Sequence, residues 1–132
     1  MIKIFKKIFS KKSSGTLIQE ALAAIREGRH EDAFRMLLKA EKIMKREGIR
    51  NPEKEMLEIF IPPPMTPTTP MLRTVGDLKR YICHEIVMAE YIHLWFVVNF
   101  GDHHDHREEN RIISKIRRVS AVGNISLDDL DF

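Results

Sequence analysis

The sequence predicts an all-α protein, a small helical bundle, on three observations. Apolar residues recur at spacings of three and four in both halves of the chain, which is the period of an α-helix. Good helix formers fill both halves. The 132 residues, 43% hydrophobic and 31% charged, suffice for one compact domain or two small helical modules and are too few for a large multidomain enzyme.

The composition narrows the classes of protein further. Cys83 is the one cysteine, so an intramolecular disulfide is excluded and a cysteine-based zinc site lacks its ligands. We therefore expect a cytoplasmic protein without a cofactor. No signal-peptide pattern is present. The longest uncharged helical stretch, Tyr91–Gly101, is shorter than the roughly 20 residues that a spanning helix requires, so we expect no membrane crossing.

Five segments are expected along the chain. A basic amphipathic helix (1–12) precedes a helical hairpin with a short third helix (16–60). Repeated Pro and Thr then predict an extended linker (61–73), because proline removes backbone donors. A second helical hairpin (74–121) and an acidic tail (122–132) complete the chain.

The first segment has an apolar and a cationic side. At about 100° per residue, one side carries Ile2, Ile4, Phe5, Ile8 and Phe9, and the other carries Lys3, Lys6 and Lys7. This pattern is typical of a helix that lies on an anionic membrane. The same apolar stripe also fits docking on a partner protein or on the chain's own core, and a basic arm on nucleic acid is the third interpretation.

The hairpin of 16–60 has small residues where two helices would cross. Gly28 is expected to end the first helix, and large and small residues alternate on the inner face of the second at Ala33, Leu37, Ala40 and Met44. The stretch GRHEDAFxxLxKA resembles the turn and second helix of a tetratricopeptide repeat. With the third helix NPEKEMLEIF, the segment is also similar to the microtubule-interacting and trafficking domain. Either resemblance implies binding of a protein or peptide and no catalysis, and an ordinary packed hairpin without a partner groove is the alternative.

The segment from Val75 to Phe100 is apolar almost all round. This predicts either a central helix wrapped by the others or an oligomer seam, with a homo-oligomer formed through 86–100. Glu90 and His93 form the Glu-x-x-His half-motif of di-iron bundles, but no second copy exists. We expect instead a local hydrogen-bonded pair, or one that Lys79 or a nearby Arg neutralises.

The sequence GDHHDHREEN allows two interpretations. Asp102, His103 and His106 have side chains that bind zinc or nickel, which predicts a metal site. Turn chemistry explains the same residues: Gly101 ends one helix, Asp105 caps the next, and Glu108 completes a capping box.

Two charged stretches close the chain. The helix after the turn is expected to place Ile112, Ile113, Ile116 and Val119 opposite a basic stripe that either binds phosphates or is merely solvated, namely Arg107, Arg111, Lys115 and Arg118. The tail alternates apolar and acidic residues, Leu127, Asp128, Asp129, Leu130, Asp131 and Phe132. It is interpreted as a linear docking motif, an internal ligand for the basic stripe, or a frayed terminus.

Together these features predict a non-enzymatic adaptor. Its hairpin would bind a partner protein or peptide, and its N-terminal helix would associate peripherally with an anionic membrane. The alternatives are a basic nucleic-acid-associated accessory protein and a His/Glu metal-binding protein.

Overall fold

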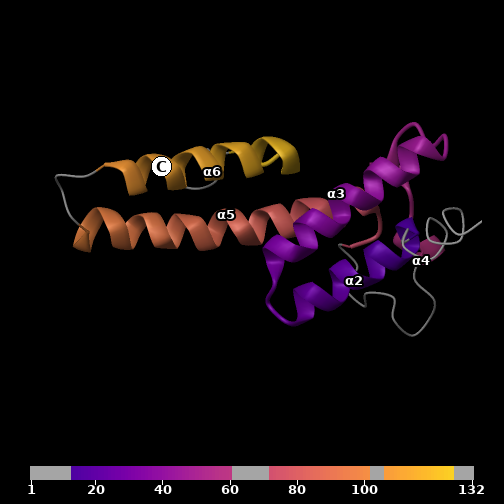
Figure 1. Ribbon diagram of the computed structural model, residues 1–132, viewed down its shortest axis with the longest axis horizontal. Helices are drawn as coiled ribbons and strands as arrows, with labels where there is room; N and C mark the ends of the chain where they lie inside the picture. The colour runs from indigo at the N-terminus through magenta and orange to yellow at the C-terminus, as the bar shows by residue number, and fades with distance from the viewer. Residues whose placement is uncertain (1–12, 61–71, 102–105, 127–132) are drawn as a thin grey trace, which may run out of the picture. The chain divides into compact units, whose positions relative to one another are not determined.

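The computed structural model describes residues 13–60, 72–101 and 106–126. Within these ranges the chain forms five α-helices and one short 3-10 helix, with no strand, so the predicted all-α class is confirmed (Figure 1). Two compact units are present, Met1–Leu78 and Lys79–Phe132. The predicted helix at 1–12, most of the linker and the end of the tail lie outside the described residues.

The first unit is built on the predicted hairpin, which consists of α2 (Ser14–Arg26) and α3 (His30–Arg46). The side chain of Ser13 begins α2 by accepting a hydrogen bond from the backbone N–H of Thr16 at 3.1 Å. Beyond the end of α2, Gly28 adopts φ +77°, a left-handed conformation that glycine takes without steric cost. Gly28 therefore ends the first helix as the sequence predicts.

Small residues allow α2 and α3 to pack closely. Ala21 and Ala24 of α2 are fully buried, and so are Ala33 and Ala40 of α3. Larger side chains such as Ile18 fill the spaces between them. The inner face of the hairpin is therefore taken up by packing within the chain.

The third helix is shorter than the sequence predicts. The 3-10 helix η1 (Pro52–Lys54) and α4 (Leu57–Phe60) are separate, because Glu55 is extended and Met56 forms an isolated antiparallel bridge with Thr74. The backbone N–H of Val75 donates to Glu55 O at 2.9 Å, so the chain entering the next helix is fastened here. Gln19 Nε2 donates to Phe60 O at 3.0 Å and holds α4 on α2.

Helix α5 (Val75–Phe100) begins at a reciprocal capping box. The backbone N–H of Asp77 donates to the Thr74 hydroxyl at 3.1 Å, and Asp77 Oδ2 accepts the backbone N–H of Thr74 at 3.1 Å. The same carboxylate oxygen accepts the N–H of Arg73 at 3.1 Å. The start of α5 is thus set by the short sequence TVGD.

The second unit pairs α5 with α6 (Arg107–Gly123), and the two helices lie antiparallel and side by side (Figure 1). Ile112, Ile116 and Val119 of α6 are buried, as the periodicity predicts, and Ile113 is half-buried. Gly123 lies against Cys83, since a Cβ added to the glycine would be 2.5 Å from the Cβ of Cys83. A glycine is required at this crossing because any side chain would collide there.

Candidate interaction surface

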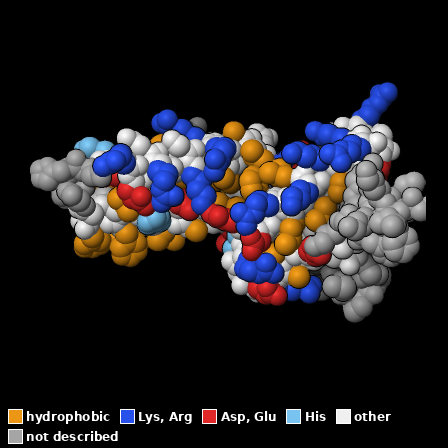
Figure 2. Space-filling model, in the orientation of Figure 1, with side chains coloured by type: hydrophobic (Ala, Val, Ile, Leu, Met, Phe, Trp, Pro, Cys, Tyr) orange, Lys and Arg blue, Asp and Glu red, His pale blue; other side chains and the backbone are white. Residues whose placement is uncertain are grey.

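Helix α5 has one face that the described part of the chain leaves in water. We name it the exposed α5 face. Its apolar members, with their exposed fractions where these are large, are Met88, Ile92 (54%), Trp95 (52%), Phe96 (52%) and Phe100 (74%), and Asn99 lies among them. Figure 2 shows hydrophobic side chains gathered along α5, on the side away from the Lys and Arg side chains of α6. Large exposed apolar patches on soluble proteins mark contact surfaces.

The aromatic side chains of this face are in mutual contact. The ring centroids of Trp95 and Phe96 are 5.2 Å apart with an edge-on geometry. Phe100 lies 5.9 Å from each of these two rings. Leaving ~100 Å² of each aromatic side chain in water forgoes roughly 2 kcal/mol apiece. This face is therefore an energetic cost to the isolated chain that a covering surface would remove.

Residues along this face are spaced as in a stripe that packs against a second helix. Tyr81, Glu85, Met88, Ile92, Trp95 and Asn99 follow one another at alternating steps of four and three. Such a 4-3 repeat places its residues in one stripe along the helix, which is the pattern of residues that pack against a second helix. No Lys, Arg, Asp or Glu occurs on this stripe between Glu85 and Asn99.

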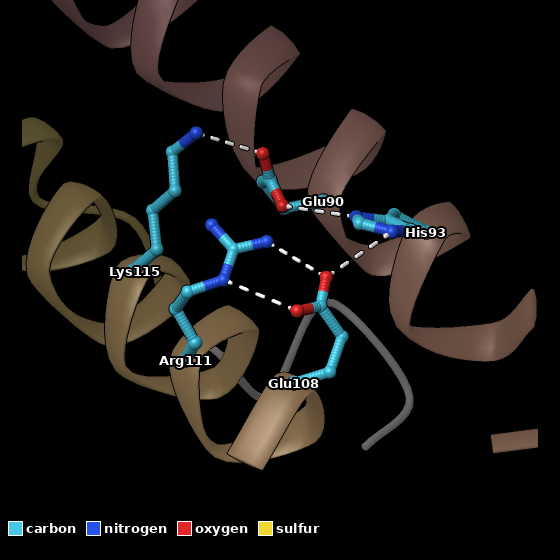
Figure 3. Close-up of polar contacts among 5 residues, drawn as sticks. All are labelled: Glu90, His93, Glu108, Arg111 and Lys115. Carbon is cyan, nitrogen blue, oxygen red and sulfur yellow. Dashed lines mark hydrogen bonds and ion pairs between the residues drawn. The ribbon is translucent and has the colours of Figure 1, made fainter. Parts of the chain in front are cut away.

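The opposite side of α5 joins α6 through a polar cluster (Figure 3). Lys115 Nζ donates to Glu90 Oε1 at 2.8 Å, and both side chains are about four-fifths buried, with exposed fractions of 21% and 18%. His93 lies between two carboxylates, with Nδ1 at 3.7 Å from Glu90 and Nε2 at 3.7 Å from Glu108. The partner that neutralises Glu90 thus comes from α6, where the sequence suggested Lys79 or an arginine.

The predicted basic stripe of α6 is partly neutralised by the same cluster. Arg111 donates to Glu108 Oε1 at 2.7 Å, and this carboxylate raises the pKa of the Arg111 guanidinium. Lys115 is held by Glu90. Arg118 is exposed and has no ion-pair partner in the described part of the chain. Arg111 and Lys115, two of the predicted phosphate-binding side chains, therefore already face carboxylates.

The metal interpretation is tested at only one of its residues, because Asp102 and His103 lie outside the described residues. His106 Nδ1 is 3.3 Å from Glu109 Oε2. Among residues 13–60, 72–101 and 106–126, no group of three metal-binding side chains is assembled. His106 occupies the N-cap position of α6 without a side-chain capping bond, and the expected cap residue Asp105 lies outside the described residues.

Several predicted binding residues lie outside the described ranges. These are the eight N-terminal residues Ile2, Lys3, Ile4, Phe5, Lys6, Lys7, Ile8 and Phe9, and the tail from Leu127 to Phe132. The expected binding roles of both segments stay predictions.

By length and composition α5 is able to cross a membrane, and it is the one helix in the described ranges that passes this test. Of its most apolar stretch, 28% is buried inside the structure. The expectation of no membrane crossing rested on the uncharged stretch from Tyr91 alone, which is only part of this helix. The single internal charge of the C-terminal half, Glu90, is the one that Lys115 neutralises.

Comparison of the chain with models of known protein families, with curated proteins and with solved structures gave no match.

Proposed function

We propose that the protein is a non-enzymatic interaction protein that holds an amphipathic helix of a protein partner against the exposed α5 face. The observation that carries the proposal is the cluster of Trp95, Phe96 and Phe100, each at least half exposed and packed ring to ring. Aromatic residues in a rigid, pre-ordered cluster are the side chains that dominate binding energy at protein interfaces.

The shape and chemistry of the face favour a helix as the ligand. Met88, Ile92 and Trp95 lie on one straight stripe of a rigid helix, and Phe96 and Phe100 border it. An apolar stripe of similar length on a second helix would therefore contact most of the face. The exposed α5 face carries no charged side chain from Met88 to Phe100, so a partner helix with apolar residues at matching spacing would bury no unpaired charge against it.

Other surfaces were expected from the sequence, among them the hairpin, residues 1–12 and the basic side chains of α6. In the hairpin, the alanines and large apolar residues between α2 and α3 are used for internal packing, so a partner bound there would contact the outer side of the helices. Attachment to an anionic membrane through residues 1–12 stays part of the proposal as a separate contact. Nucleic-acid binding is the weaker alternative, because Arg111 and Lys115 face Glu108 and Glu90.

Site-specific photocrosslinking in cells tests the proposal. A photoreactive phenylalanine analogue is placed at Phe96 in one variant of the full chain and at Val98 in the control. The two side chains have similar exposed fractions, 52% and 45%, but lie about 160° apart around the helix. We expect protein adducts from position 96 only, attached to the apolar side of a helix in the crosslinked protein.

Adducts of equal yield at the two positions, or no protein adduct at position 96, would contradict the proposal. Adducts at position 96 that contain lipid alone would assign the face to a membrane and would also contradict it.

A further inference from the structure

We infer that the helix bound to the exposed α5 face is α5 of a second copy of this chain, running antiparallel to the first and centred on Ile92. The inference rests on the proposed function and names its partner. A symmetric dimer requires a surface that is complementary to itself. If a residue of the first copy contacts a second residue in the other copy, the same contact occurs again with the two copies exchanged.

The exposed α5 face has this self-complementarity. In an antiparallel pair centred on Ile92, a residue at a given distance before Ile92 faces the residue at the same distance after it in the other copy. Glu85 and Asn99 each lie seven residues from Ile92, so they would face each other twice. Ala89, an exposed residue next to this face, and Trp95 each lie three residues from Ile92, so the largest side chain of the face would meet a small one.

The polar pair fits chemically as well. Glu85 is half-buried on α5 and makes no hydrogen bond or ion pair within the described part of the chain. Asn99 donates one amide hydrogen to Trp95 O at 2.7 Å, which leaves its second N–H for a carboxylate. Each end of the seam would thus satisfy a carboxylate that a single chain leaves to water.

A parallel pair fits less well. It would set Glu85 against Glu85 and Trp95 against Trp95 of the other copy, which opposes like charges and crowds the two largest rings. It would also align the two helix dipoles, whereas an antiparallel pair opposes them. The antiparallel arrangement turns two α5–α6 hairpins into a four-helix bundle with the basic side chains of α6 outside.

The area available predicts a dimer of moderate strength. The exposed parts of Met88, Ile92, Trp95, Phe96 and Phe100 from two copies amount to on the order of 1,000 Å², the lower bound for a specific interface. Association should therefore be visible as a change of mass over a concentration series.

Sedimentation equilibrium of the purified full chain tests the dimer, with Ile92→Arg as the seam variant and Val98→Arg as its matched control. Both variants put Arg in place of an exposed β-branched residue of α5, with exposed fractions of 54% and 45%, on sides about 120° apart. We expect dimerisation to weaken at least about tenfold for Ile92→Arg and by less than about twofold for Val98→Arg. Circular dichroism confirms that both variants keep their helix content.

The register has a test of its own. Asn99→Lys would face Glu85 of the other copy and should tighten the dimer by about three- to tenfold, whereas Asn99→Glu should weaken it by a similar factor. In a parallel dimer residue 99 would face itself, so both substitutions would weaken association. Opposite signs support the antiparallel register, and equal signs overturn it.

The dimer and the proposed function can fail separately. A full chain that stays monomeric at all concentrations overturns the dimer, while helix adducts to a different protein at position 96 would keep the proposed function. If the chain is monomeric and removal of residues 1–12 makes it dimerise, that segment is the occupant of the face, and the dimer of the intact chain is overturned. Pelleting with vesicles that is lost in Ile92→Arg would assign the face to lipid and overturn both.

Discussion

Gly123 determines how closely α6 approaches α5. A Cβ at this position would lie 2.5 Å from the Cβ and 2.9 Å from the Sγ of Cys83, distances that require the helices to move apart. Gly123→Ala should therefore lower the free energy of unfolding by roughly 1–3 kcal/mol, the usual cost of overpacking. Urea denaturation followed by circular dichroism measures this change.

Gly15→Ala is the matched control for that substitution. The nearest atom to its added Cβ is Phe60 O at 3.6 Å, an ordinary contact, and the residue lies inside α2. Alanine favours the helix, so this variant should be neutral or more stable by up to about 1 kcal/mol. A loss of stability of equal size in the two variants would contradict the tight crossing.

Lys115 forms an ion pair with Glu90 of α5, and Arg111 forms one with Glu108 of α6. The two ion pairs differ mainly in burial. Lys115→Met keeps the apolar stem but leaves Glu90, which is 18% exposed, without its ammonium partner. We expect a loss of about 1–2 kcal/mol in the free energy of unfolding. Arg111→Met breaks a pair whose side chains are 62% and 45% exposed, and because water screens this pair the substitution should leave stability unchanged. Thermal denaturation at neutral pH measures both, and an equal loss would show that burial does not distinguish the pairs.

The Thr74–Asp77 capping box secures the first turn of α5. Asp77→Ala removes the acceptor of two backbone N–H groups, those of Arg73 and Thr74, and should lower stability by about 1 kcal/mol. Asp77→Asn keeps an acceptor oxygen and should cost only a few tenths of a kcal/mol. Urea titration of the two variants checks the difference, which would vanish if the cap did not contribute.

The elements themselves follow closely from local sequence. The turn at Gly28 and the buried alanines of α2 and α3 were predictable, because glycine conformation and helical periodicity depend on neighbouring residues only. The break at Glu55 was not, since an isolated bridge to Thr74 produces it and a bridge depends on a segment 18 residues further along the chain. Helix α6 begins at Arg107, one residue later than a cap at Asp105 would place it, and helix ends commonly vary by one or two residues.

The exposed α5 face was predictable from the sequence only in part. Periodicity showed that α5 is apolar nearly all round, but it does not tell which side a neighbouring helix covers. The pairing of Glu90 with Lys115 joins residues 25 positions apart and depends on how α6 is rotated. Once the rotation of α6 is known, the side of α5 that α6 does not cover, with Trp95 and Phe96, is identified as exposed.

Membrane attachment through residues 1–12 and helix binding on the exposed α5 face should be separable. We expect the intact chain to pellet with vesicles that contain phosphatidylglycerol and not with phosphatidylcholine vesicles. Phe5→Asp or removal of residues 1–12 should abolish pelleting, because the apolar side or the lysines would be lost. Ile92→Arg should pellet normally, and unchanged pelleting after removal of residues 1–12 would contradict the assignment of lipid binding to that segment.

The chain has a single tryptophan, and Trp95 stands on the exposed α5 face. All indole fluorescence of the folded protein therefore originates at that surface. The emission colour and its quenching by acrylamide report directly whether water, a second copy or another molecule covers it. The intrinsic fluorescence of an unlabelled sample therefore measures what fraction of the protein has this surface covered.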